Sequence, residues 1–374
     1  MGPTYFWFQF DALRQQAEAF GLSPADARAP YYLGNFWYAH RRYDEAIGCW
    51  ERARARDPEF ATTHRNLGLA YFNKRHDANG ARAAYARAFA LNPADARVLF
   101  ELDQLERRLN APPAERLARL ERHAGLVAQR DDLTIEYITL LNMHGRYAEA
   151  LAALLARQFH PWEGGEGKAT GQYVLSLLGR ADALLAAGEH AHAAELLERA
   201  LDYPHSLGEG RLPNAQANNV QFYLGLARAG MADAAGARAC FERAALGAGE
   251  PTSVMYYNDQ PPDLIFYQGL ARRALGRADE ARELFERLVA YGQAHRDDPA
   301  TIDYFAVSLP TFLVFDEDLA LRNRIHCHYM IALGRLGLGE AAAAQQEFGA
   351  VLALDANHQG ALMHSKLLVG LGGA

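Results

Sequence analysis

The chain is 374 residues long and carries 38 Lys and Arg against 45 Asp and Glu, a net charge of −7. Half of its residues are hydrophobic and 22% are charged, the composition of a folded globular protein. No run of basic residues offers the surface that nucleic acids require, no apolar stretch approaches the roughly 20 residues of a membrane span, and the chain does not begin like a cleaved leader. These features predict a cytoplasmic protein that binds neither nucleic acid nor membrane.

The first predicted element is a helix over about residues 6–20, within an opening segment of residues 1–26. Aromatic side chains are dense at its start, which reads Tyr-Phe-Trp-Phe-Gln-Phe. Such a cluster would be a poor solvated end for a helical array and a good contact face. We therefore expect this segment to dock onto another chain or domain through Phe6, Trp7 and Phe10.

A pattern of small and large residues follows, and it recurs about 34 residues later. Small residues allow two helices to approach closely, large apolar residues fill the space between them, and proline ends the second helix. The first copy consists of Leu33, Gly34, Trp37, Tyr43, Ala46, Trp50, Ala53 and Pro58; the second consists of Leu67, Gly68, Tyr71, Ala81, Tyr85, Ala88 and Pro93. This pattern resembles the tetratricopeptide repeat.

Looser copies continue to the end of the chain. The third, near residues 96–125, is degenerate, since Asp103 stands where a small residue belongs. The resemblance implies an all-α, right-handed superhelix of about eight helical hairpins, closed by a helix near residues 360–370. We divide the chain into the opening segment 1–26, repeats one to three at 27–125, and repeats four to eight with the closing helix at 126–374.

The first helix of each repeat should line a concave face. Asn35, Asn66 and Arg97 match the clamp with which some tetratricopeptide domains hold a C-terminal carboxylate, whereas Tyr31 and Glu101 replace two of its basic residues. A groove for some other extended peptide is the alternative. Its candidate residues are Tyr31, Asn35, Tyr38, Arg65, Asn66, Phe72 and Asn142.

Four connections, at residues 158–172, 203–219, 247–263 and 292–323, are longer than such a repeat requires. All four join a second helix to the next first helix, so we expect them along one edge. Either they pack on one another and on an adjoining domain, or they bind a ligand such as a sugar or polar peptide. This insert rim has as its candidate residues His160, Trp162, Glu163, Glu166, Tyr257, Asn258, Asp259 and Asp303.

Catalytic and metal-binding patterns are weak. The Gly-rich stretch at residues 163–167 lacks the Lys-Ser/Thr ending of a phosphate loop. His326 and His328 stand two residues apart, which places them on different faces of a helix. The three cysteines form no ligand spacing. We therefore expect no metal, no cofactor and no catalytic residue.

Three inserts carry a more specific resemblance, in the segments FHPWEGGEG at residues 159–167, YNDQPPD at 257–263 and LALRNRIHCHY at 319–329. They resemble the C-terminal, repeat-containing half of large uncharacterised bacterial proteins that begin with a β-rich domain similar to sugar mutarotases and glycosidase sandwiches. The resemblance implies a carbohydrate context and a neighbouring β-rich domain, and it supplies no catalytic residue.

The leading hypothesis is a non-catalytic scaffold that docks a protein partner or an adjoining domain. The alternative is the accessory half of a carbohydrate-active enzyme, in which the insert rim contacts an oligosaccharide. A groove that binds an extended peptide is the third.

Overall fold

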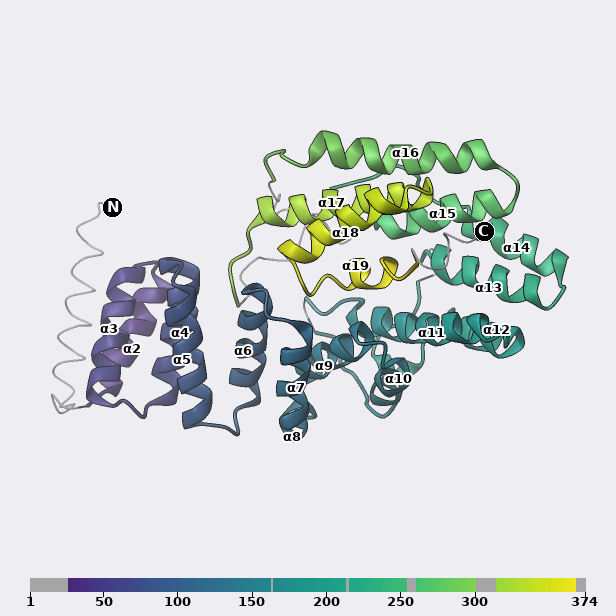
Figure 1. Ribbon diagram of the computed structural model, residues 1–374. Helices are drawn as coiled ribbons and strands as arrows, with labels where there is room; N and C mark the ends of the chain where they lie inside the picture. Colours follow the sequence, from purple (N-terminus) through teal and green to yellow (C-terminus); the bar gives the residue numbers. More distant parts are fainter. Residues whose placement is uncertain (1–25, 163, 213–214, 254–259, 301–313, 368–374) are drawn as a thin grey trace, which may run out of the picture. The chain divides into compact units, whose positions relative to one another are not determined.

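The computed structural model describes residues 26–162, 164–212, 215–253, 260–300 and 314–367, and these contain α-helices, one short 3₁₀ helix and no strand. None of the described helices is long and apolar enough to cross a membrane. Figure 1 labels them. They are α2 (Arg28–Ala39), α3 (Tyr43–Arg56), α4 (Ala61–Arg75), α5 (Ala78–Leu91), α6 (Ala96–Arg108), α7 (Pro113–Arg122), α8 (Ala124–Val127), α9 (Asp131–Met143), α10 (Tyr147–Leu155), α11 (Lys168–Ala186), α12 (His190–Arg199), η1 (His205–Leu207), α13 (Asn218–Gly230), α14 (Ala234–Ala244), α15 (Pro262–Ala274), α16 (Ala278–His295), α17 (Leu319–Gly337), α18 (Ala341–Leu354) and α19 (Gln359–His364).

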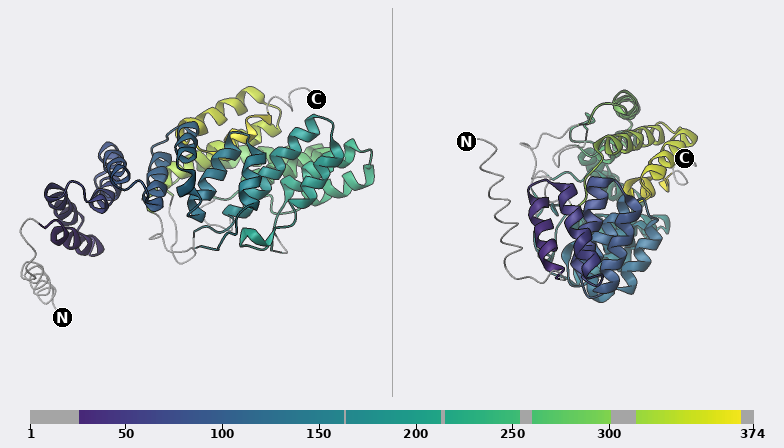
Figure 2. Two further views of the ribbon diagram at one scale, coloured as in Figure 1. Left: turned by 90° about the horizontal axis from the view of Figure 1, so that it is seen from below. Right: turned by 90° about the vertical axis from the view of Figure 1, so that its left-hand side faces the viewer.

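The helices form two compact units. The described part of the first unit contains α2 to α6 and residues 314–316, and that of the second contains α7 to α19. Figure 2 shows α2 to α5 as two successive antiparallel pairs. In the second unit, antiparallel packing joins α9 with α10, α11 with α12, α13 with α14, α15 with α16 and α17 with α18. The predicted all-α helical-repeat fold is confirmed.

Glycine and a large aromatic residue meet at the crossing point of four of these pairs. A Cβ atom added to Gly34 would lie 2.4 Å from the indole of Trp50, and one added to Gly68 would lie 2.5 Å from the ring of Tyr85. The same relation joins Gly225 to Phe241 and Gly269 to Phe285. Each ring therefore occupies the space that a side chain on the facing helix would need, as the repeat pattern predicts.

The turn between the two helices of a pair adopts a left-handed backbone conformation. Gly145 and Gly276 have φ values of 75° and 79° there, which glycine accepts without steric cost. Arg41 and Ala232 occupy equivalent turns with φ values of 60° and 61°. The chain direction thus reverses within two or three residues, and the paired helices lie against each other.

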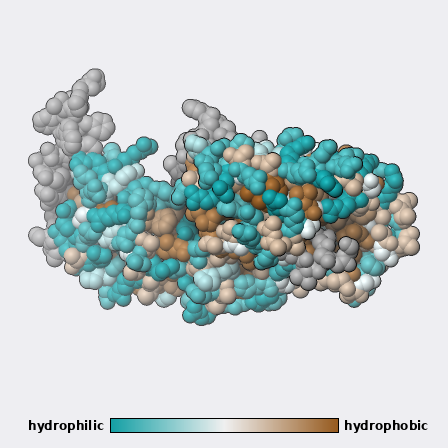
Figure 3. All heavy atoms as spheres, turned by 45° about the horizontal axis from the view of Figure 1, so that its top comes forward, coloured by the Kyte–Doolittle hydropathy of each residue, from teal (hydrophilic) through white to brown (hydrophobic). Residues whose placement is uncertain are grey.

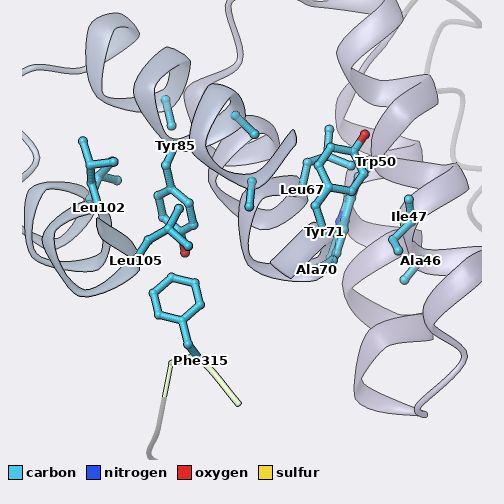
Figure 4. Packing of buried hydrophobic residues seen from close by; sticks show 14 residues of the cluster. Ala46, Ile47, Trp50, Leu67, Ala70, Tyr71, Tyr85, Leu102, Leu105 and Phe315 are labelled. Atoms are coloured by element: carbon cyan, nitrogen blue, oxygen red, sulfur yellow. The ribbon is translucent and has the colours of Figure 1, made fainter. Parts of the chain in front are cut away.

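The core of the first unit is a single cluster that runs from α3 to α6 (Figure 4). Trp50, Leu67, Tyr85 and Leu105 are each 2% exposed or less. Phe315 belongs to the same cluster although it comes from a segment more than 200 residues later in the chain. In Figure 4 its ring lies next to Tyr85 and Leu105.

In the second unit, the end of the chain returns to the first helices of that unit. Asn357 accepts a hydrogen bond from Arg116 Nη1 at 2.8 Å and donates to the carbonyl oxygen of Ala111 at 3.0 Å. Asn110 binds the main chain at both Ala353 and Ala356. On the face of this unit seen in Figure 3, hydrophilic residues cover most of the surface and hydrophobic residues show between them.

Several sequence predictions need correction. The last insert was placed at residues 292–323, but α16 continues to His295 and α17 begins at Leu319. Gly292 lies inside α16, where a Cβ atom would be 2.6 Å from the Cys327 carbonyl oxygen, so it permits a close helix crossing and does not end the helix. Asn323 lies in α17 and donates to the His295 carbonyl oxygen at 2.8 Å.

The first insert and the closing helix also differ from expectation. Residues 168–172 belong to α11, so that insert is shorter than predicted. The described closing helix, α19, begins at Gln359 and ends at His364, before the predicted end near residue 370. The helices of the degenerate third repeat, α6 and α7, fall in different units. The opening helix at residues 6–20 lies outside the described residues, and the division into 1–26, 27–125 and 126–374 stays a prediction.

Replacement of Gly34 by alanine tests the crossing geometry. We expect Gly34→Ala to lower the free energy of unfolding by about 1–3 kcal/mol, because the new methyl group overpacks against Trp50. Gly48→Ala in α3 is the control, since its Cβ would meet nothing within 4 Å and should stabilise the helix by about 0.5–1 kcal/mol. Urea denaturation of both variants measures the difference, and equal stabilities would contradict the assigned register.

Candidate functional site: the inner face of the first unit

A pocket of about 470 Å³ opens between the first helices of the first unit. Tyr31, Asn35 and Tyr38 line it from α2, and Arg65 and Asn66 line it from α4. The structure thus brings together five of the seven predicted groove residues. The remaining wall consists of Ala39, Trp50, Ala61, Thr62, Leu69, Asn92, Asp95, Arg97 and Val98.

The other two groove candidates lie elsewhere. Phe72 packs against the core cluster of the first unit, next to Phe315. Asn142, in the second unit, is fully buried, and its amide is bonded to Gln172 and Ser176. Asn142 therefore holds α9 to α11 and does not line a groove, which corrects the prediction.

Hydrogen bonds fix the two asparagines of the pocket. Trp50 Nε1 donates to Asn35 Oδ1 at 3.1 Å, and Asn66 Nδ2 donates to the same oxygen at 2.9 Å. Arg65 Nη1 donates to Asn66 Oδ1 at 3.1 Å. Within the described residues no hydrogen bond uses Asn35 Nδ2, so this amide is an oriented donor on the pocket wall.

A buried carboxylate controls the charge of the pocket. Glu101 is 1% exposed and accepts hydrogen bonds from Arg65 Nε at 2.6 Å, Arg97 Nε at 2.9 Å and Tyr85 Oη at 3.1 Å. Burial raises the pKa of Glu101, but the two guanidinium groups outweigh it and the net pKa is lowered. Burial opposes the charge of Arg65 as well, but its bonds to Glu101 raise its pKa above the ordinary value.

The two arginines consequently differ in what they offer a ligand. The side chain of Arg65 is 19% exposed and its fork is held by Glu101 in a bidentate pair. The side chain of Arg97 is 64% exposed and uses only Nε for Glu101. Arg97 is thus the accessible cation of the pocket. Glu101 orients Arg97 by accepting the bond from Nε. In the sequence, Glu101 is notable only because it replaces a basic residue of the carboxylate clamp.

The same face of α4 holds a short non-helical segment of the chain itself, residues 314–316, which we call the strap. Asn73 lies two helical turns beyond Asn66, and both polar atoms of its side-chain amide bind the strap. Asn73 Nδ2 donates to the Val314 carbonyl oxygen at 2.9 Å, and Asn73 Oδ1 accepts from the Asp316 N–H at 2.9 Å. The sequence analysis did not predict this contact. The one local feature that points to it is the spacing of Asn66 and Asn73, which lie seven residues apart and so share a face of the helix.

The corresponding face of the second unit is covered by the chain's own closing helix, as Figure 1 shows for α19 beside α11. Gln359 exchanges hydrogen bonds with Gln172 of α11 at 2.9 and 3.1 Å. His364 lies 2.9 Å from Tyr329 Oη and packs against the rings of Phe266 and Tyr267. The described part of this face is therefore occupied, in contrast to the pocket of the first unit.

The described parts of the insert loops contact one another in chain order. The N–H of Phe159 donates to the Ser206 carbonyl oxygen at 2.8 Å, and the N–H of Gly167 donates to Glu209 at 2.9 Å. Further along, the amides of Gln216 and Gln260 pair at 2.8 Å. These contacts place three inserts along one edge.

The three rim candidates that the structure describes have different surroundings. His160 is exposed and contacts Asp131, Glu166 is exposed, and Trp162 lies partly buried over Gly165. The rest lie outside the described residues. They are Glu163, Tyr257, Asn258, Asp259 and Asp303 of the rim and Phe6, Trp7 and Phe10 of the docking segment.

The histidine pair and the cysteines have structural partners. His326 is 8% exposed with Nε2 2.8 Å from the Thr252 carbonyl oxygen, and His328 pairs with Glu347 at 2.6 Å. Among the described residues no group of three or more His, Cys, Asp or Glu side chains is arranged to hold a metal ion. All three cysteines are buried, and burial raises the pKa of Cys327 to about 11.

One repeat of the chain matches a known family directly. The family model described as Tetratricopeptide repeat matches residues 263–291, in α15 and α16. Solved helical-repeat structures match more of the chain at low similarity. YrrB, titled "a TPR protein with an unusual peptide-binding site", matches with a TM-score of 0.34 and 14% identity over 61% of this chain and 89% of that chain.

Two further structures resemble the chain to a similar degree. A tetratricopeptide repeat protein from Parabacteroides merdae gives a TM-score of 0.33 and 15% identity over 69% of this chain and 89% of that chain. The APC/C hetero-tetramer Cut9-Hcn1 gives a TM-score of 0.35 and 14% identity over 96% of this chain and 59% of that chain. These values are too low to carry ligand geometry from those proteins to this one.

The Glu101 network gives a stability prediction. Glu101→Gln should lower the free energy of unfolding of the first unit by about 2 kcal/mol, because Arg65 keeps its charge at a largely buried position and loses its counter-charge. Glu45→Gln, which breaks an exposed pair with Arg42, should change it by less than about 1 kcal/mol. Chemical denaturation monitored by tryptophan fluorescence measures both variants, and an equal loss of stability would contradict the larger contribution assigned to the Glu101–Arg65 pair.

The closing helix gives a pH prediction. His358 Nδ1 accepts the N–H of Ala361 at 3.0 Å and caps α19, and burial lowers the pKa of His358 from near 6.5 to about 4. Between these two values the unfolded chain binds a proton that the folded chain does not, so stability is complete above pH 6.5 and falls as the pH drops toward 4. The melting temperature should therefore decrease across this window.

His358→Asn separates this effect from general acid sensitivity. Asparagine preserves the cap but does not titrate, so the melting temperature of the variant should depend less steeply on pH between 6.5 and 4. His192→Asn, at an exposed position on α12, should leave the steepness near that of the wild type. A His358→Asn profile parallel to the wild type would refute the assignment.

Proposed function

We propose that this tetratricopeptide-repeat protein is a non-catalytic scaffold whose first unit binds an extended peptide of a protein partner along α2, α4 and α6. The observation that carries the proposal is the strap. Asn73 binds the main chain of residues 314–316 through both atoms of its side-chain amide. This face of α4 therefore already holds one segment of the chain through its main-chain groups, and the pocket continues along the same helix.

The chemistry of the pocket suits a peptide better than a small metabolite. Tyr31, Tyr38 and Trp50 supply flat apolar walls for a side chain, and Asn35 Nδ2 supplies a donor for a main-chain carbonyl. Arg97 favours a carboxylate at the open end. An extended peptide with one acidic residue satisfies these three requirements together.

The carbohydrate alternative and the adjoining β-rich domain rest on sequence resemblance alone. Trp162 is partly buried over Gly165, and the described insert loops bond to one another. We therefore base the proposed function on the groove.

Selection from a displayed library of random linear peptides against the full chain tests the proposal. Enriched peptides should bind wild-type protein and lose at least about tenfold in affinity with Arg97→Gln or Asn35→Ala, because each variant removes a polar contact of the pocket. Arg87→Gln, an exposed arginine on α5, is the matched control and should bind normally. Peptides that bind all three variants equally, or a selection without enrichment, would refute peptide binding in this pocket.

A further inference from the structure

The strap shows which sequence the far end of the groove accepts. We propose that the partner peptide carries an aliphatic residue, an aromatic residue and an acidic residue in succession, and that it binds in place of the strap, whose Val314, Phe315 and Asp316 have this pattern. The inference rests on the proposed function and adds the chemistry of the partner. The strap is then an internal pseudo-ligand that a partner displaces.

The first requirement is a main chain with a carbonyl group and an N–H group free to pair with Asn73. The donor and acceptor atoms of Asn73 are both used, at 2.9 Å each, by main-chain groups two residues apart. In a helical peptide the main-chain N–H and C=O groups hydrogen-bond to one another along the helix axis, so they would not be available to Asn73. With the strap in place Asn73 is 7% exposed and both polar atoms of its amide are satisfied, so a peptide that replaces the strap must supply the same two bonds.

The second requirement is an aromatic ring at the middle position. Phe315 is 3% exposed, with its ring centroid 5.1 Å from Phe72 and 5.8 Å from Tyr85 in edge-to-face arrangements. Leu102 and Leu105 of α6 complete the slot, as Figure 4 shows. A smaller side chain would leave a cavity among rigid rings, so the slot selects for phenylalanine or a ring of similar size.

The third requirement is an acid after the ring. Lys74 Nζ lies 2.8 Å from Asp316 Oδ2 and also faces the ring of Tyr43 at 4.8 Å, which orients the ammonium group. The Asp316 side chain is 59% exposed, so the pair contributes selectivity and little affinity. A basic residue at this position would meet Lys74 as a like charge.

The strap has the attachments of a bound peptide. Main-chain bonds to one asparagine, one buried ring and one partly exposed ion pair join it to the first unit. A peptide supplied in trans makes the same set of contacts. Being tethered, the strap competes at a high effective concentration, so removal of its ring should raise the affinity for a free peptide by about tenfold or more.

The test uses the full chain and a fluorescent, N-acetylated peptide with the sequence of residues 314–319, Val-Phe-Asp-Glu-Asp-Leu. Fluorescence anisotropy should show that Phe315→Ala protein binds it at least about tenfold more tightly than wild type. The double variant Phe315→Ala/Asn73→Ala should lose this binding, and Phe315→Ala/Asn79→Ala, changed at an exposed asparagine of α5, should keep it. The peptide with alanine in place of phenylalanine should not bind.

Circular dichroism and thermal melts show whether each variant is folded. If Phe315→Ala unfolds the first unit, Phe315→Leu, which removes less side-chain volume from the slot but still loses the ring contacts, takes its place. The inference is overturned if a folded variant with an opened slot fails to bind the peptide. It is also overturned if the peptide binds equally well without Asn73. Library-selected peptides that need Arg97 but do not compete with the strap peptide would leave the proposed function intact while refuting this one.

Discussion

The close approach of glycine to an aromatic ring at the helix crossings is the constraint on which the rest of the structure depends. Gly34 faces Trp50 and Gly68 faces Tyr85, each with no room for a Cβ atom. The contact sets the distance and the register within each pair. Asn35 and Arg65 therefore face one pocket together with Trp50, although they belong to different repeats.

The pocket combines this rigid frame with a buried charge. Desolvation of Glu101 is offset by two guanidinium groups and the Tyr85 hydroxyl, so the carboxylate stays ionised and holds both arginines in place. Its effect is to neutralise Arg65 and to leave Arg97 exposed toward a ligand. Arg65, Arg97 and Asp95 are the charged residues that line the pocket, and Glu101 compensates the charge of Arg65 from behind its wall.

Each unit also uses its inner face to hold part of its own chain. The strap fills a slot in the first unit, and α19 covers the first helices of the second through Gln359 and His364. The two units hold these segments through different types of contact. The strap is a non-helical segment bound through its main chain, whereas α19 is a capped helix that packs through side chains. The pocket beside the strap leaves the first unit with space for a further peptide segment.

The repeat pattern predicts the helices, their pairing and a set of groove candidates of which five line the pocket, because these features follow from contacts within one repeat or between adjacent repeats. Gly34 and Trp50 lie 16 residues apart, and the spacing of small and large residues records such contacts. Only the tertiary structure decided that Glu101 neutralises Arg65, that Asn73 binds the strap and that Arg116 holds Asn357. The last two contacts join residues 241 positions apart, and no periodicity of the sequence links such partners. Which residues pair there depends on which buried polar atoms the folded chain brings within hydrogen-bonding distance.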